Sequence, residues 1–255
     1  MQIKIIAVGS SKWERFIYNW GVSFLIGEDV LFDTFGKPTV FLRNIKKQNI
    51  DLSRIKHIVI SHNHWDHISG LWYIMYKFKN INPALSNTKG INEIRKGGVN
   101  VYICPNFGEE TKKRINSFGV NVIEAKGLLR IRDEIYSTGE IAGKYKDKNI
   151  FEQSLVIDSE NGLIVITGCA HPGILTILKE VKKNFSDREI FCVLGGFHLL
   201  DKKRKDIELI IDEFKRMGIK KVGPTHCSGK LAKEIFKRIY QDNFVEIRTG
   251  QILQF

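Results

Sequence analysis

Short hydrophobic runs alternate with amphipathic stretches along most of the chain. The runs are rich in Ile and Val and end at Gly, Asn or Asp, which predicts β-strands. The predicted strands are residues 4–8, 22–26, 30–33, 57–60, 101–104, 120–123, 154–158, 163–167, 190–194, 221–223 and 244–247. The amphipathic stretches predict helices at residues 40–48, 68–78, 109–117, 173–184, 206–217 and 229–240.

The order of these elements predicts an α/β fold, with a mostly stranded first part and alternating strands and helices after it. The 255 residues, of which 43% are hydrophobic, suit a single domain that spans residues 1–255. Residues 80–100 have little periodicity and are interpreted as a surface excursion. Residues 127–149 are strongly charged, and we interpret them as a lid or an edge hairpin.

Composition narrows the possible partners. The 40 Lys and Arg residues against 28 acids give a net charge of +12, which favours an anionic ligand such as a phosphate ester, a nucleotide or a nucleic acid. Much of the excess is lysine spread over predicted helix faces, so a solvated surface explains it better. The oligomeric state stays open.

The sequence also indicates where the protein resides. The four cysteines have no paired spacing, so a disulfide framework is not expected. The first residues have the pattern of a short strand and lack the layout of a signal peptide, and no apolar run has the length of a membrane span. We therefore expect a cytoplasmic protein without a membrane partner.

A dense cluster of metal-binding residue types follows the hydrophobic run that ends at residue 60. It contains His62, His64, Asp66 and His67. Imidazoles and carboxylates bind zinc and similar divalent ions. In extended backbone His62 and His64 project to the same side. One loop can therefore supply His62 and His64 to one metal, and Asp66 and His67 to a second metal that helps to activate a water.

Other candidate residues also follow predicted strands. His171, His198 and His226 each lie just after a hydrophobic run, and we expect all three to lie with the cluster at one sheet edge. Asp33 ends another run. Its carboxylate could orient a metal-bound imidazole, or it could simply initiate a turn.

The order of these motifs resembles the metallo-β-lactamase superfamily over nearly the whole chain. The resemblance implies a four-layer αββα sandwich with metals at one sheet edge. The implied cofactor is Zn²⁺ or another divalent metal, with Mn²⁺ and Fe²⁺ as alternatives, and one or two ions per chain.

A narrower resemblance is to the branch that includes 7,8-dihydropterin-6-methyl-4-(β-D-ribofuranosyl)aminobenzene-5′-phosphate synthase. That enzyme joins a pterin diphosphate to an aryl ribosyl phosphate. The similar stretches are residues 31–34, 61–67, 137–141, 167–174, 195–199 and 225–227. Within this branch an acid–His pair precedes the glycine at Gly21, and this chain has Asn19 and Trp20 instead.

The chain departs from the wider superfamily at two positions. No histidine precedes the strand at residues 154–158, so His171 is expected to complete the first metal position with His62 and His64. Cys169 stands where a metal-bridging aspartate is usual. Its thiol could ligate a metal, but we favour an inert buried cysteine near the metals, because His171 already completes the first position.

The leading interpretation is a metal-dependent hydrolase or transferase that acts on a phosphate- or diphosphate-bearing small molecule, for which the narrower resemblance implies a pterin-type substrate as one candidate. Asp66, His67 and His226 would hold the second metal, and Asp66 would also position the attacking water. His198 would protonate a leaving oxygen or bind phosphate from outside the metal shell. Phe197 could stack on a flat ring, although a buried aromatic is the more common case.

Two alternatives belong to other classes. The first is an RNA or nucleotide phosphodiesterase, which the positive charge suggests. It is less favoured, because the sequence has no evident aromatic and basic platform for a polymer. The second is a metal-binding protein with little catalysis, which the altered ligand set leaves open.

Overall fold

The computed structural model describes residues 1–17, 19–80 and 98–255, and two large β-sheets dominate it. The first sheet has seven strands in the order β15-β1-β2-β3-β4-β5-β6. Its strands are β1 (Gln2–Gly9), β2 (Gly21–Ile26), β3 (Val30–Phe32), β4 (His57–Val59), β5 (Asn100–Ile103), β6 (Asn121–Glu124) and β15 (Ile252–Gln254). Strands β3 to β6 run parallel to one another.

The second sheet has six strands in the order β14-β13-β12-β11-β8-β7. Its strands are β7 (Leu129–Arg132), β8 (Ile135–Ser137), β11 (Leu155–Ser159), β12 (Gly162–Thr167), β13 (Ile190–Gly196) and β14 (Lys221–Thr225). Strands β12, β13 and β14 run parallel. A separate hairpin pairs β9 (Ile141–Tyr145) with β10 (Lys148–Glu152).

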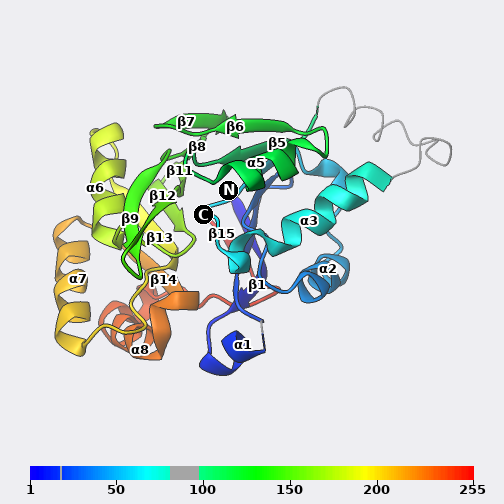
Figure 1. Ribbon diagram of the computed structural model, residues 1–255. Helices are drawn as coiled ribbons and strands as arrows, with labels where there is room; N and C mark the ends of the chain where they lie inside the picture. The colour runs from blue at the N-terminus through cyan, green and yellow to red at the C-terminus, as the bar shows by residue number, and fades with distance from the viewer. Residues whose placement is uncertain (18, 81–97) are drawn as a thin grey trace.

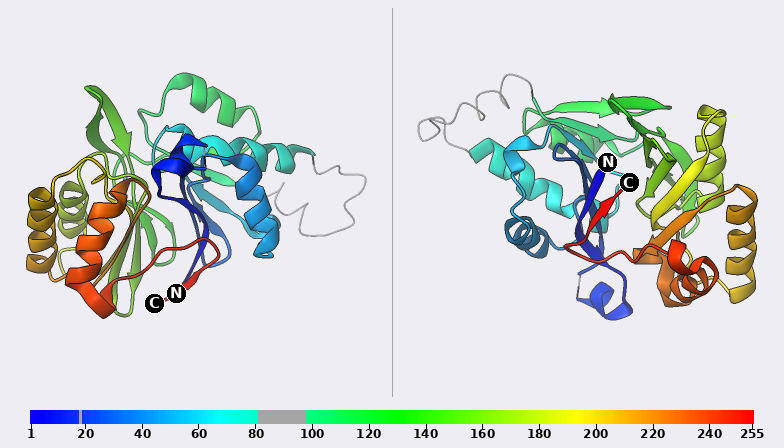
Figure 2. Two further views of the ribbon diagram at one scale, coloured as in Figure 1. Left: turned by 90° about the horizontal axis from the view of Figure 1, so that it is seen from below. Right: turned by 180° about the vertical axis from the view of Figure 1, so that it is seen from behind.

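Helices cover the outer face of each sheet, as Figures 1 and 2 show. The helices against the first sheet are α2 (Pro38–Lys47), α3 (Trp65–Asn80) and α5 (Glu109–Asn116). Those against the second sheet are α6 (Ile174–Asn184), α7 (Arg204–Arg216) and α8 (Gly229–Tyr240). A short helix, α1 (Lys12–Phe16), follows β1. None of the helices in the described residues is long and apolar enough to cross a membrane.

Three hydrophobic clusters separate four layers. One lies between the first sheet and its helices, and contains Phe41 and Leu71. A second lies between the two sheets, and contains Phe24 and Ile164. The third lies between the second sheet and its helices. Because both faces of the central strands are covered, a strand such as β2 is buried at every position. The predicted αββα sandwich is confirmed.

Most predicted elements are present, with small shifts at their ends. Helix α3 begins at Trp65, so Asp66 and His67 lie in its first turn. The predicted strand at residues 244–247 is wrong: only Phe244 bridges to β14. Residues 127–149 contain the edge hairpin β7–β8, strand β9 and the first two residues of β10, so the edge-hairpin alternative describes part of this stretch. The predicted excursion lies largely outside the described residues. Helix α1 and strand β15 were not predicted, and neither was the β9–β10 hairpin as a separate element.

Phe197, at the end of β13, belongs to the third hydrophobic cluster. Its ring contacts Phe214 of α7 and Phe236 of α8 at centroid distances of 5.7 and 5.6 Å, and its side chain is 1% exposed. The prediction that Phe197 stacks on a substrate is therefore wrong, because helices α7 and α8 cover the ring.

Replacing Phe197 with alanine should lower the free energy of unfolding by about 3–5 kcal/mol, because the change leaves a cavity in a closely packed core. Urea unfolding measures this loss. The control is Leu209→Ala on α7, whose side chain is 53% exposed, and it should shift stability by no more than about 0.5 kcal/mol. Equal effects of the two variants would contradict the core position of Phe197.

Candidate metal centre

The candidate residues gather at one edge of the two sheets. In each sheet the parallel strands end at the same edge, so residues that follow them are brought together. Asp33 follows β3, the cluster beginning at His62 follows β4, Cys169 and His171 follow β12, His198 follows β13, and His226 follows β14.

The first group consists of His62, His64 and His171. One nitrogen from each ring lies within 4.8 Å of the others. His62 Nε2 is 3.1 Å from His64 Nδ1, and the His171 ring lies edge-on to both other rings. Three imidazoles that converge in this way match a known catalytic zinc ligand set.

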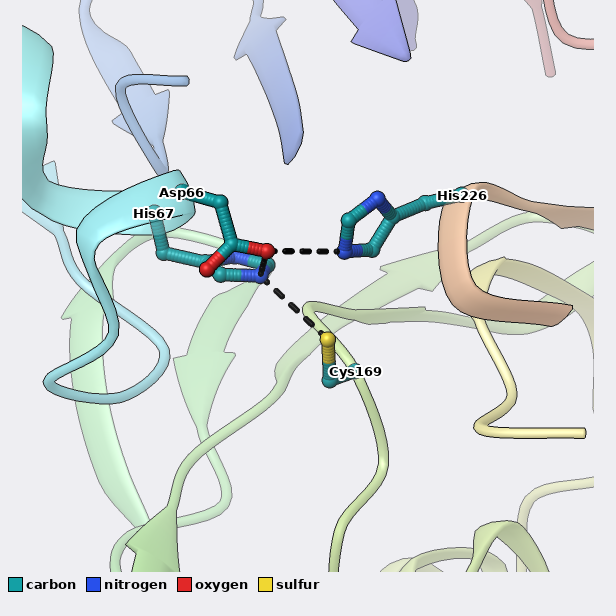
Figure 3. Close-up of side chains that lie close together, drawn as sticks. All are labelled: Asp66, His67, Cys169 and His226. Atoms are coloured by element: carbon teal, nitrogen blue, oxygen red, sulfur yellow. Dashed lines mark hydrogen bonds and ion pairs between the residues drawn. The ribbon is translucent and has the colours of Figure 1, made fainter. Parts of the chain in front are cut away.

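The second group consists of Asp66, His67, Cys169 and His226, whose side chains converge in Figure 3. The Asp66 carboxylate lies 3.2 Å from His226 Nε2 and 3.4 Å from His67 Nε2. Cys169 Sγ lies 3.3 Å from His67 Nε2. The sulfur thus faces the other ligand atoms of this group, as a ligand would, although it is also buried near them, as the inert interpretation expects.

Outer contacts decide which ring nitrogens face the centre. His171 Nδ1 donates to Glu152, and His226 Nδ1 donates to the carbonyl oxygen of Gly9 at 3.0 Å. In a neutral His226 the buried Nε2 therefore presents a lone pair toward the Asp66 carboxylate, which is itself an acceptor. A positive charge between these two acceptors, from a proton on His226 or from a metal ion, satisfies both, so the residues present fit a divalent metal.

Glu152, at the end of β10, holds the turn that carries Cys169 and His171. Its fully buried carboxylate accepts hydrogen bonds from the backbone N–H groups of residues 169, 170 and 171 at 2.8–2.9 Å. It also accepts from His171 Nδ1 at 2.9 Å. Glu152 was not predicted as a site residue, because no local pattern distinguishes it from the other charged residues that precede β11.

Asp33 has the same function in the first sheet. Its carboxylate accepts from Ser61 N and Ser61 Oγ at 2.7 Å, and from His67 Nδ1 at 2.5 Å. These bonds join the end of β3 to the start of the ligand loop and to the first turn of α3. The orienting role proposed for Asp33 is therefore the one its contacts support.

The electrostatics of the centre follow from burial and from the packing of like groups. Burial and the neighbouring imidazoles hold the pKa of His62 well below its usual value, and they lower that of His64 to about 4. Burial lowers the pKa of His67, but Asp33 and Asp66 outweigh it and raise that pKa well above its usual value.

Two buried carboxylates, Asp66 and Glu152, remain ionised. Burial would raise the pKa of Asp66, but His67 and His226 hold it well below its usual value. Burial would also raise the pKa of Glu152, but His62 and His171 hold that pKa well below its usual value. The centre without a metal therefore carries ionised Asp66 and Glu152 and neutral His62 and His64, whereas His67 would have to give up a proton to ligate a metal.

Backbone strain is concentrated at the same sheet edge. Asp33, Ala170, His198 and His226 all have φ between 50° and 63°. Non-glycine residues rarely adopt this conformation, which costs about 1–3 kcal/mol at each position. Such strain persists where the surrounding structure fixes the backbone, and here it lies next to the metal-ligand candidates.

The centre opens into a cavity of about 740 Å³. His64, Asp66, Cys169 and His171 lie on its wall, together with His198. Its other side chains include four cations, Arg15, Lys144, Lys146 and Lys202, and the aromatic residues Trp20, Trp65 and Tyr145. The sequence analysis singled out none of these seven residues as cavity-lining.

Tyr145, at the tip of the β9–β10 hairpin, lies over the first group. Its ring makes edge contacts with His64 at 5.0 Å and with His171 at 5.2 Å between centroids. His198 lies beside this group: its ring is 4.5 Å from that of His171, and its donor atom lies among those of Cys169 and Cys227.

Comparisons with known proteins agree with this arrangement. The family model described as the metallo-beta-lactamase superfamily matches residues 21–226. A 7,8-dihydropterin-6-methyl-4-(beta-D-ribofuranosyl)-aminobenzene-5′-phosphate synthase of Methanocaldococcus jannaschii is 29% identical, with 92% of this chain and 90% of that protein covered. A second protein of that organism, described as uncharacterized, is 30% identical, with 98% and 99% covered.

A solved structure resembles the whole chain. It is the crystal structure of Tm1679, described as a metal-dependent hydrolase of the beta-lactamase superfamily. The match has a TM-score of 0.74 and 28% identity, with 100% of this chain and 99% of that chain covered.

Replacing Glu152 with glutamine should weaken metal binding about 10- to 100-fold, because His171 loses the carboxylate that orients it. It should also lower the free energy of unfolding by about 1.5–3 kcal/mol through the loss of charge-assisted hydrogen bonds. Metal titration and urea unfolding measure the two effects. The matched control is the exposed Glu160→Gln, which should change neither. Unaltered metal affinity in Glu152→Gln would show that this carboxylate does not orient a ligand.

Acidification should destabilise the metal-free protein. His62 and His64 have folded-state pKa values below the value of 6.5 for the unfolded chain. Their contribution to stability is therefore present above pH 6.5 and is lost as the pH falls from 6.5 toward 4. His67 acts in the opposite direction, because its raised pKa favours the folded state below pH 6.5.

Urea unfolding with a chelator, at several pH values between 7 and 4.5, tests this expectation. The denaturation midpoint should fall with pH in the wild type, and it should fall less steeply in His64→Gln, which does not titrate. Identical slopes would mean that His64 does not resist protonation in the folded state.

Proposed function

The chain belongs to the metallo-β-lactamase superfamily, and on that premise we propose that it is a metal-dependent hydrolase or transferase acting on a phosphate- or diphosphate-bearing small molecule. The observation that carries the proposal is the position of the ligand groups. Members of both groups lie on the wall of a cavity whose other lining residues include four cations and one acid, Asp201.

The donor set favours zinc as the metal. Imidazole, carboxylate and thiol groups are the ligands that Zn²⁺ takes in proteins, whereas Mg²⁺ prefers oxygen ligands. His62, His64 and His171 would hold one ion, and Asp66, His67 and His226, with Cys169, would hold another. When bound, such ions supply Lewis acidity toward phosphoryl oxygens.

The chain's own residues supply binding and orientation. Lys144, Lys146 and Lys202 are exposed at the cavity and can bind phosphate oxygens. The ionised Asp66 carboxylate can accept a hydrogen bond from an attacking hydroxyl or amine and thereby orient it. The aromatic side chains of Trp65 and Tyr145 offer a surface for a flat ring.

The size of the cavity favours a small molecule over a polymer. A volume of about 740 Å³ lies within the usual range for small-molecule sites, about 300–1,000 Å³. The relative named as a dihydropterin synthase supports a pterin-type substrate. Asn19 and Trp20, which replace the acid–His pair of that branch, leave the substrate itself to experiment.

An assay of diphosphate release separates the candidate activities. The zinc-loaded protein is incubated with a dihydropterin-methyl diphosphate, alone or with an aminobenzene ribosyl phosphate. We expect saturable turnover. Diphosphate release that requires the amine identifies a transferase, and release without it identifies a hydrolase. Turnover of an RNA oligonucleotide or bis(p-nitrophenyl) phosphate in its place would favour the phosphodiesterase. Absence of all turnover would favour a metal-binding protein.

Charge-neutralising variants test how the substrate binds. The triple variant Lys144→Gln, Lys146→Gln and Lys202→Gln should raise KM at least about tenfold with a smaller change in kcat, because each lost charge weakens phosphate binding. The matched control replaces Lys179, Lys183 and Lys205, which are on or next to outer helices. An unchanged KM in the triple variant would contradict the assigned binding site.

The His62→Ala, His64→Ala double variant should lose turnover and at least one metal equivalent.

A further inference from the structure

Three donor side chains form a third group, distinct from the two ligand groups above. They are Cys169, His198 and Cys227, and their donor atoms all lie within 4.8 Å of one another. Each comes from the end of a different parallel strand of the second sheet: Cys169 after β12, His198 after β13 and Cys227 after β14. Only Cys169 is shared with the second ligand group.

The packing brings the two sulfur atoms toward each other. Cys227 Sγ lies 3.4 Å from the carbonyl oxygen of Cys169, to which it donates. A side chain at Gly196 would prevent this approach: a Cβ there would lie 2.7 Å from Cys227 Sγ and 3.1 Å from Cys169 Cα. Both cysteines are free thiols. Strand β13 therefore ends in glycine where the two sulfur-bearing turns converge.

One ring nitrogen of His198 makes no hydrogen bond. Its Nδ1 is buried and has no hydrogen-bond partner among the described residues. Its backbone has φ of 53°, a strained value for a residue with a side chain. A buried imidazole nitrogen without a partner is costly unless something else binds there.

The distances suit a tetrahedral metal. Two sulfur atoms bound to zinc at 2.3 Å lie about 3.8 Å apart, so donors within 4.8 Å need only small side-chain shifts. All three residues also line the cavity, which leaves a fourth coordination position open toward it. Two thiolates and an imidazole with an open position are a known catalytic zinc ligand set.

We propose that Cys169, His198 and Cys227 form a third metal position that takes a soft divalent ion such as Zn²⁺ or Cd²⁺. Each thiol that binds gives up its proton to solvent. Thiolate ligands discriminate against Mn²⁺, which prefers oxygen. Cys169 serves either this position alone or both this position and the second group as a bridging sulfur. His198 is then a metal ligand, whereas the sequence analysis predicted that it protonates a leaving oxygen or binds phosphate from outside the metal shell.

Titration of reduced, metal-free protein with Cd²⁺ tests the proposal without any substrate. The ultraviolet absorbance that arises from cadmium–thiolate bonds reports the number of sulfur ligands. We expect two in the wild type, one in Cys227→Ser, and two in Cys192→Ala, which removes a buried thiol between the two sheets. The wild type should also bind at least one more equivalent of Cd²⁺ than of Mn²⁺, as measured by elemental analysis after gel filtration.

His198→Gln provides a second test if Cys227→Ser does not fold. It should lower the affinity for one Cd²⁺ equivalent about 10- to 100-fold, as expected when a ligand is lost. Full thiolate absorbance in Cys227→Ser, or unchanged Cd²⁺ affinity in His198→Gln, would overturn the proposal. A native intact mass that is 2 Da low, which indicates a disulfide between Cys169 and Cys227, would do the same. These readouts do not depend on turnover, so loss of the proposed enzymatic function would leave them interpretable.

Discussion

The buried Glu152 carboxylate fixes the geometry on which the whole centre depends. It has no solvent to stabilise its charge, so it is compensated by three backbone N–H groups and by His171 Nδ1. Removing an ionised carboxylate from water is costly unless its acceptor sites are filled, and here filling them shapes the turn from residue 169 to 171. The positions of Cys169 and His171 are a consequence of that requirement.

In each sheet a buried carboxylate orients one of the candidate ligands. Asp33 in the first sheet accepts hydrogen bonds from Ser61 and His67, as Glu152 in the second accepts them from the turn after β12. Each carboxylate accepts a hydrogen bond from Nδ1 of one histidine, so the opposite ring nitrogen is turned toward the centre. The outer contacts of the ligands thus orient them before any metal binds.

Shifted pKa values and strained backbone conformations occur at the same sheet edge as the candidate ligands. Burial and mutual repulsion keep His62 and His64 neutral, and Asp66 and Glu152 stay ionised because imidazoles lie beside them. Strained residues lie directly beside these groups, where the packing of two sheets fixes the backbone. The cavity adds four cationic side chains to its lining. The proposal of an anionic substrate rests on these cations beside the candidate metal ligands.

The sequence by itself determined the fold class and most of the candidate residues. Hydrophobic runs identify strands that are buried on both faces, and side-chain type identifies imidazole and carboxylate ligands wherever they follow such a run. Periodicity failed where an element is short or exposed, as in α1, the β9–β10 hairpin and residues 244–247.

Only the tertiary structure decided the partners of each residue. Glu152 lies 19 positions from His171 in the chain, and no local sequence pattern marks it as a buried hydrogen-bond acceptor. Phe197 and His198 are neighbours, yet one packs under α7 and α8 and the other lines the cavity. Cys169 and Cys227 are 58 positions apart and meet because β12, β13 and β14 are parallel and end together. Contacts between distant segments depend on sheet order and on which way each strand end turns, and these are properties of the packed layers rather than of any local pattern.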